Sequence, residues 1–251
     1  MVYTFPELKQ SNLVNVPHFL VVGNPIAHSL SPAMHQLGLN DHNIQAEYHA
    51  LRLEEHEITG FIAWMNRDSF LGCNVTIPFK ERFISLLDHI HDTAAETGAV
   101  NTIQKSQGML NGFNTDVEGF LEPLWEFENM LHGERAIVFG TGGASKAVHS
   151  ALRRLGMGEI VFVTRNPGLF NQDSVNLTSD GNDMVSRYCG YDQFEAYAEN
   201  TALIVNSTPL GMMPETDSSP IEGINKEILS DKICYDLVYN PLETRFLSLA
   251  K

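Results

Sequence analysis

A lysine lies where the chain would ordinarily favour an acid, in residues 72–80, Gly-Cys-Asn-Val-Thr-Ile-Pro-Phe-Lys. Apolar residues at 69–75 predict a strand, Pro78 predicts a helix start, and Lys80 would lie in the first helical turn. Because the helix macrodipole is positive at that end, a cation there is unfavourable. This cost suggests that the Lys80 ammonium group serves a site. The spacing alone favours a solvated surface lysine, and the motifs further along the chain shift the balance towards a site.

Two serines precede another predicted helix. Ser31 and Pro32 are typical of an N-cap and a first helical position, and the helix would run to about residue 39. Capping alone accounts for Ser31, whereas Ser29 has no such role. Since a helix N-terminus favours anions, the two hydroxyl groups predict a seat for a carboxylate.

A glycine turn, residues 140–145 (Gly-Thr-Gly-Gly-Ala-Ser), follows a predicted strand at 136–139. A helix at 146–155 and a strand at 160–163 are predicted next. This is the βαβ layout that binds a pyrophosphate at a helix N-terminus, with Ser145 where Gly or Ala is usual.

The end of the strand at 160–163 predicts which dinucleotide binds. An NAD site would place an acid there to bind the ribose hydroxyl, but the residues are Thr164, Arg165 and Asn166. A guanidinium group can bind a 2′-phosphate through two hydrogen bonds and stack on adenine. We predict NADP, and an ordinary surface arginine is the alternative.

The remaining pattern indicates the elements that position these residues. Strands are predicted at 18–23, 46–53 and 69–75, alternating with helices at 32–39, 54–66 and 79–87. A short helix at 93–98, a hairpin of 99–103 with 109–114, and a helix from Thr115 or Asp116 to about 128 follow. After the glycine unit come a polar loop at 166–183, strands at 202–209 and 233–238, and an amphipathic helix at 241–251. This alternation predicts an α/β fold with mainly parallel sheets.

Composition excludes several classes of protein. The formal net charge of −15 over 251 residues argues against nucleic acid as a general partner. No apolar run is long enough to span a membrane, and residues 1–17 resemble a loose extension rather than a signal peptide. The three scattered cysteines favour reduced thiols in a cytoplasmic protein. His89 and His91 are close enough to suggest a metal site, although a surface pair fits them better.

Taken together, the motifs resemble those of shikimate dehydrogenases from about residue 18 to the end. The motifs that carry this resemblance are residues 23–32, 72–80, 98–102, 112–116, 140–145, 206–211 and 236–241. The resemblance implies NADP-dependent reduction of 3-dehydroshikimate to shikimate. It also implies a substrate domain at 1–114 and a Rossmann NADP-binding domain at 115–240, flanking a cleft. The helix at 241–251 would pack back towards the first domain.

The resemblance also implies a role for individual residues. Lys80 and Asp116 would be the catalytic pair, in which the ammonium group stabilises negative charge on oxygen and supplies a proton while the carboxylate orients it. The substrate residues would be Ser29, Ser31, Thr76, Asn101, Asp116 and Tyr239. The cofactor residues would be Gly140, Gly142, Gly143, Ala144, Thr164, Arg165, Asn166, Leu237 and, more weakly, Asp92.

Two alternatives stay open: a quinate dehydrogenase, which the paired serines disfavour, and a catalytically weak ligand-binding or regulatory relative. Members of the family usually continue beyond the helix around Arg245 with a loop and a helix that carries a substrate-binding Gln. These 251 residues do not include them, so the resemblance implies a raised KM for shikimate with normal NADP binding. A monomer or a homodimer is expected.

Overall fold

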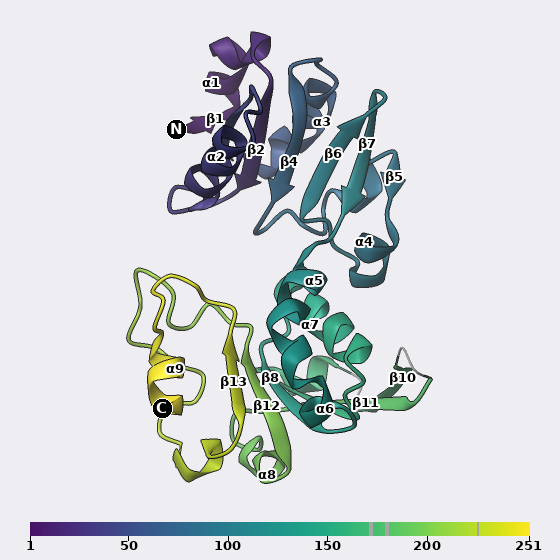
Figure 1. Ribbon diagram of the computed structural model, residues 1–251, viewed down its shortest axis with the longest axis vertical. Coiled ribbons are helices and arrows are strands. Elements are labelled where there is room, and N and C mark those ends of the chain that lie inside the picture. Colours follow the sequence, from purple (N-terminus) through teal and green to yellow (C-terminus); the bar gives the residue numbers. More distant parts are fainter. Residues whose placement is uncertain (171–172, 179–180, 225) are drawn as a thin grey trace. The chain divides into compact units, whose positions relative to one another are not determined.

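The computed structural model describes residues 1–170, 173–178, 181–224 and 226–251. The chain divides into two compact units, Met1–Thr115 and Asp116–Lys251. Each unit is built on its own sheet with packed helices (Figure 1). The predicted α/β class with mainly parallel pairing is therefore confirmed.

The first sheet has a parallel part and an antiparallel part. The strand order is β1 (Val2–Thr4), β3 (Glu47–Arg52), β2 (His18–Gly23), β4 (Phe70–Val75), β6 (Thr102–Ser106), β7 (Met109–Phe113) and β5 (His89–Ile90). Pairing is parallel from β1 to β4, antiparallel at β4–β6 and β6–β7, and parallel at β7–β5. The chain runs from β2 to β3 on one side of it and then crosses to β4 on the other side. This reversal puts a topological switch point between β2 and β4.

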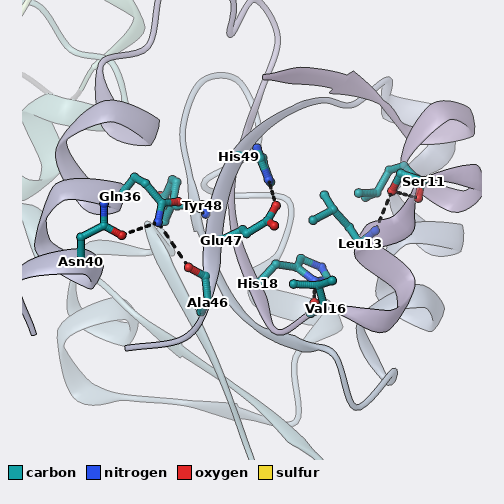
Figure 2. A network of polar contacts seen from close by, with 11 residues as sticks. Ser11, Leu13, Val16, His18, Gln36, Asn40, Ala46, Glu47, Tyr48 and His49 are labelled. Carbon is teal, nitrogen blue, oxygen red and sulfur yellow. Dashed lines mark hydrogen bonds and ion pairs between the residues drawn. The ribbon is translucent and has the colours of Figure 1, made fainter. Parts of the chain in front are cut away.

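Alternating side chains of the first sheet face two apolar clusters. Leu20 and Val22 of β2 pack with α1 (Phe5–Gln10) and α3 (Ile58–Met65), whereas Val21 packs on the side of α2 (Ser31–Asp41). Gln36 connects α2 to β3, because its Oε1 accepts the Tyr48 backbone N–H at 2.9 Å and its Nε2 donates to the Ala46 carbonyl at 3.3 Å (Figure 2). Two further helices of this unit are η2 (Glu55–Glu57) and α4 (Asp92–Thr97).

The N-terminal segment is not the loose extension that the sequence predicts. β1 pairs with β3, and α1 is followed by the 3-10 helix η1 (Asn12–Asn15). Phe5, Leu8 and Leu13 are buried in the larger core cluster. Three buried apolar side chains, two from α1 and one from η1, therefore fix this segment.

The predicted helix at residues 79–87 is wrong. Residues 77–83 form no α-helix, and only the 3-10 helix η3 (Ile84–Leu86) follows. The Lys80 carbonyl accepts the Val100 backbone N–H at 2.8 Å, which commits it to a neighbouring segment, and Phe79 and Phe83 are buried in the core. Because Lys80 does not lie in a helical turn, the macrodipole argument for its role does not apply.

The second sheet has Rossmann-type order. It runs β10 (Asp173–Leu177), β11 (Asp183–Cys189), β9 (Glu159–Val163), β8 (Arg135–Phe139), β12 (Thr201–Asn206) and β13 (Ile233–Asp236). All pairs are parallel except β10–β11. The order reverses between β8 and β12, which is where doubly wound sheets bind ligands.

Helices cover both faces of the second sheet. Ala136 and Val138 face α5 (Asp116–Leu121) and α7 (Gly143–Arg154), while Ile137 and Phe139 face α8 (Glu195–Ala198) and α9 (Arg245–Ala250). The predicted helix to residue 128 divides at Pro123 into α5, η4 (Glu122–Phe127) and α6 (Glu128–Leu131). The 3-10 helices η5 (Pro167–Leu169) and η6 (Lys226–Leu229) complete the unit.

Two further expectations for this unit need correction. The polar segment at 166–183 contains β10, whose antiparallel pairing with β11 supplies hydrogen bonds that its composition did not indicate. The last helix begins at Arg245, four residues later than predicted, with Thr244 as its N-cap. Phe246 of this helix is fully buried in the second unit's own core, and packing of the helix towards the first domain stays a prediction.

The remaining expectations concern thiols, metals and membranes. Cys73, Cys189 and Cys234 are free, and burial raises the pKa of the Cys189 thiol to about 11. The described residues contain no group of three or more side chains that could hold a metal ion. No helix in the described ranges combines the length and apolarity needed to cross a bilayer.

Candidate active site

The predicted substrate residues of the first unit gather at one edge of its sheet. Ser29 follows β2 and Thr76 follows β4, so both leave the carboxyl ends of adjacent parallel strands at the switch point. Asn101 lies at the same edge, because β6 runs antiparallel to β4 and Asn74 is paired with Thr102. Topology alone therefore brings these three polar residues to one place.

Backbone hydrogen bonds fix the loops at that edge. The Asn24 N–H donates to the Ile77 carbonyl at 2.9 Å, and the Thr76 N–H donates to the Val22 carbonyl at 2.9 Å. Lys80 is half-buried, and its carbonyl is held by Val100, next to Asn101. The loops after β2 and β4 and the start of β6 are thus connected through main-chain atoms.

The serine pair is arranged differently from the prediction. Ser31 is the first residue of α2 rather than its N-cap, and the N-cap residue Leu30 makes no side-chain capping bond. The Ser29 Oγ instead accepts the Ser31 backbone N–H at 3.3 Å. Ser29 therefore has a local structural role, and the two hydroxyl groups still lie within one turn of chain at a helix start.

Asn101 is the most constrained of the predicted substrate residues. It is 8 % exposed, its Nδ2 donates to Thr115 Oγ1 at 2.9 Å, and its Oδ1 accepts the Thr115 backbone N–H at 2.9 Å. The Thr102 hydroxyl also donates to this Oδ1 at 2.9 Å. These hydrogen bonds determine which of the two terminal atoms of the Asn101 amide is oxygen and which is nitrogen.

Three predicted residues belong to other parts of the chain. Asp116 is the first residue of α5 and of the second unit, directly after Thr115. Tyr239 lies in the second unit and is 62 % exposed. Asp92, a predicted cofactor residue, is exposed at the start of α4 in the first unit, whereas the other predicted cofactor residues lie in the second.

The glycine turn of the second unit fits a dinucleotide pyrophosphate. Gly140 has a φ of +103°, and a Cβ there would meet Ser207 Oγ at 2.9 Å, so a side chain is excluded. Gly142 and Gly143 have open space where their Cβ atoms would stand. Ala144 follows in α7, and the Ser145 hydroxyl closes the first turn by donating to the Gly142 carbonyl at 2.6 Å. The open space beside Gly142 and Gly143 thus leaves room for a phosphate at the N-terminus of α7.

The residues predicted to bind the 2′-phosphate follow β9 as expected. Thr164 is buried, and its Oγ1 lies 3.5 Å from Thr141 Oγ1 and accepts the Asn166 backbone N–H at 3.4 Å. Arg165 is exposed. Burial raises the pKa of Tyr191, and the positive charge of Arg165 opposes that shift. The Thr164 hydroxyl therefore shapes the turn that presents Arg165.

Comparisons with known proteins show the family of the chain. The family model for the shikimate dehydrogenase substrate binding domain matches residues 21–103. Shikimate dehydrogenase (NADP(+)) of Syntrophomonas wolfei is 38 % identical over 92 % of this chain and 79 % of its own length. The chain belongs to the shikimate dehydrogenase family. Solved structures of shikimate dehydrogenases superpose on it accordingly.

Two of these structures illustrate the likeness. Shikimate dehydrogenase 1 of Peptoclostridium difficile gives a TM-score of 0.75 at 31 % identity, covering 93 % of this chain and 81 % of its own. Shikimate 5-dehydrogenase of Thermus thermophilus, in complex with NADP(H) and shikimate, gives 0.73 at 33 % identity, covering 93 % and 83 %. Both confirm the fold predicted for a shikimate dehydrogenase.

Sequence reasoning missed polar residues that support the site of this shikimate dehydrogenase family member. In the first unit, Tyr48 Oη donates to Asn74 Oδ1 at 2.6 Å, and Asn74 Nδ2 donates to Thr102 Oγ1 at 3.1 Å, which leads to Asn101. In the second, Asp236 accepts hydrogen bonds from Asn206 and Thr244. The available signal was a polar residue inside or at the end of an apolar strand pattern.

Proposed function

We propose that the chain catalyses the reversible, NADP-dependent reduction of 3-dehydroshikimate to shikimate, a step of aromatic amino acid biosynthesis. One observation carries this proposal: the segments bearing Ser29, Thr76, Lys80 and Asn101 meet at one edge of the first sheet, inside the region matched by the substrate-binding family model. A ligand-binding edge with this set of side chains suits a small polyhydroxylated acid.

Different polar groups of the first unit bind different parts of the substrate. The Ser29 and Ser31 hydroxyls, at the start of α2, bind the carboxylate, where the helix N-terminus adds favourable charge. Thr76 and Asn101 bind ring hydroxyls, with Asp116 and Tyr239 as further contacts. The buried amide of Asn101, held by Thr115, provides orientation with little loss of side-chain entropy.

Lys80 and Asp116 perform the acid–base chemistry. When bound, NADPH supplies the hydride that reduces the substrate carbonyl. Negative charge then grows on the carbonyl oxygen, where the Lys80 ammonium group stabilises it and donates a proton. The Asp116 carboxylate orients that ammonium group, and the reverse reaction takes the proton back.

The second unit holds the cofactor. Gly140, Gly142, Gly143 and Ala144 let the backbone approach the pyrophosphate, and the α7 N-terminus stabilises its charge. Arg165 binds the 2′-phosphate from a turn shaped by Thr164, with Asn166 beside it. Leu237 and Asp92 are proposed as further cofactor contacts.

An assay of NADP reduction tests this function directly. Purified chain is mixed with NADP and shikimate, and in parallel with NADP and quinate or with NAD and shikimate. We expect turnover to be greatest with NADP and shikimate, since the paired serines favour the smaller acid. Greater kcat/KM with quinate would reassign the substrate. Ligand binding by calorimetry without turnover of either acid would instead support a regulatory relative.

The enzyme is further proposed to act in the cytoplasm as a monomer or a homodimer. Sedimentation velocity on the purified chain tests the assembly, and a fluorescent fusion in cells tests the location. A larger assembly or a membrane-bound signal would contradict these two points without affecting the proposed reaction.

A further inference from the structure

A cluster of three residues connects two loops at the carboxyl edge of the second sheet; we name half-buried Asp236 and buried Asn206 and Thr244 the Asp236 clamp. Asp236 Oδ1 accepts from Asn206 Nδ2 at 2.9 Å and from the Val238 backbone N–H at 2.9 Å, and its Oδ2 accepts from the Thr244 hydroxyl at 2.5 Å. Asn206 and Thr244 are 0 % and 1 % exposed. One carboxylate thus holds three separate parts of the chain.

The first loop held by the clamp is 207–213. Asn206 Oδ1 accepts both the backbone N–H and the hydroxyl of Thr208, at 3.0 and 2.6 Å, and its Nδ2 also donates to the Leu210 carbonyl at 3.2 Å. Ser207, between these residues, donates its hydroxyl to the Phe139 carbonyl at 2.6 Å. This loop is therefore the wall against which the Gly140 turn is packed.

The second loop held by the clamp is 237–243. Asp236 and Thr244 close it at its base, and the Leu237 N–H donates to the Asn206 carbonyl at 3.0 Å. The two loops also meet directly, because the Met213 N–H donates to the Asn240 carbonyl at 3.2 Å. Leu237 and Tyr239, the proposed cofactor and substrate contacts, are the first and third residues of this loop.

We propose that Asp236 is a positioning residue that, through Asn206 and Thr244, holds the 207–213 and 237–243 loops in register and so places Leu237 and Tyr239 for cofactor and substrate. The identity of those ligands rests on the proposed function. Apolar packing alone would bury these loops but would not fix their positions relative to each other. Directional hydrogen bonds to one carboxylate do fix them.

The test compares two buried threonines of the second unit. Thr244→Val removes the hydroxyl that donates to Asp236, and Thr201→Val removes a buried hydroxyl that donates to the Tyr197 carbonyl at 2.8 Å at the opposite, amino end of β12. Thr244→Val also removes the N-cap acceptor of the Leu247 backbone N–H at 3.3 Å, whereas Thr201→Val deletes the bond to Tyr197, so we expect the larger decrease in Tm for Thr244→Val. Thr244→Ser restores the hydroxyl, and Asp236→Asn keeps an oxygen for Asn206 and Val238 while replacing the acceptor for Thr244.

Activity should separate the two threonines. We expect Thr244→Val and Asp236→Asn to lower kcat/KM for shikimate by about ten- to a hundredfold, with effects on both kcat and KM, because small displacements of positioning groups are costly. Thr201→Val should stay within about twofold of the parent, and Thr244→Ser should recover most of the loss. Equal losses for Thr244→Val and Thr201→Val would overturn the proposal.

Hydrogen exchange keeps the result independent of the reaction. Peptides covering 206–213 and 237–247 should exchange faster in Thr244→Val and Asp236→Asn than in Thr201→Val. Unchanged exchange in both variants would overturn the clamp. If the parent turns over neither shikimate nor quinate but exchange rises as expected, the clamp stands and the proposed function fails.

Discussion

The two units fix their polar loops in different ways. At the edge of the first sheet, the loops after β2 and β4 and the start of β6 are joined by main-chain bonds, Asn24 to Ile77 and Val100 to Lys80. At the edge of the second sheet, the loops after β12 and β13 are joined by main-chain bonds and, in addition, by side chains, above all the Asp236 carboxylate. The connections between the loops after β2 and β4 therefore do not depend on which side chains are present, whereas those between the loops after β12 and β13 depend in part on particular side chains.

This difference separates chemistry from support. A main-chain bond survives any substitution that keeps the backbone in place, so the side chains of Thr76 and Lys80 can be removed with little effect on the bonds that join the loops after β2 and β4. A side-chain bond is lost when its donor or acceptor is changed, and leaving the partner buried costs about 1–3 kcal/mol. Substitutions in the first unit should therefore report on the reaction, and those in the second also on loop order.

The largest effect is expected for Lys80→Ala. Because it is the backbone carbonyl of Lys80 that holds Val100, the variant should fold normally while kcat falls by roughly 10²–10⁴. Substrate affinity, measured by calorimetry, should change far less. The matched control is Lys105→Ala, which removes an ammonium group bonded to the carbonyls of Asn66 and Arg67. Near-parental kcat in Lys80→Ala would refute the assigned chemistry.

A smaller loss is expected for Arg165→Ala. Removing a charge-assisted contact to the 2′-phosphate should weaken NADP binding by about 1.5–3 kcal/mol and leave NAD binding nearly unchanged. Titration with both cofactors measures the two affinities. The control is Arg153→Ala, near the end of α7, which removes a hydrogen bond to the Leu177 carbonyl. Equal losses for NADP and NAD would remove the basis for the cofactor assignment.

The fold was largely predictable because its periodic signals are local. The βαβ pattern around the glycine turn predicted β8, α7 and β9 to within a few residues, since apolar strand residues and turn glycines act at short range. The helix expected at 79–87 failed for a non-local reason, the bond from Val100 to the Lys80 carbonyl. β10 was missed because its hydrogen bonds come from pairing with β11.

The candidate site was only partly accessible in the same way. Ser29, Thr76 and Lys80 follow predicted strand ends, so their gathering at one edge could be expected from parallel topology. The supporting groups could not be found locally. Asn74 and Thr102 are 28 residues apart, and Asp236 and Asn206 are 30 apart, so their contacts exist only once the sheets are formed.

Backbone strain gives a third test, on stability. Gly140 has a φ of +103° and no room beside Ser207, so Gly140→Ala should lower the free energy of unfolding by about 1–3 kcal/mol. Gly168→Ala is the control, because nothing lies within 4 Å of its would-be Cβ and its φ is not positive. Denaturant unfolding of both variants measures the difference. Equal stability would mean that the 207–213 loop moves freely away from the turn, contrary to the clamp.

The smallest expected effect is on how the free energy of unfolding changes with pH. It compares two carboxylates of the second unit. Burial raises the pKa of Asp236 above its ordinary 3.8, against the bonds from Thr244, Val238 and Asn206. Burial also acts to raise the pKa of Glu159, but the bonds and charges of Arg135 and Arg187 outweigh it and lower the pKa below 4.5.

The two shifts have opposite consequences for stability. Where the folded pKa is raised, the folded state binds more protons than the unfolded state, so the contribution of Asp236 is fully present below about pH 3.8 and is lost as the pH rises through the folded value. The contribution of Glu159 is present above pH 4.5 and is lost as the pH falls through its folded value. Unfolding free energies of the parent, Asp236→Asn and Glu159→Gln should be measured across the acid range. The parent-minus-variant difference should fall with rising pH for Asp236→Asn and rise for Glu159→Gln, at most about 1.4 kcal/mol per pH unit. A difference that rises with pH for Asp236→Asn as well would show that the Asp236 carboxylate is held by its donors more strongly than burial opposes it.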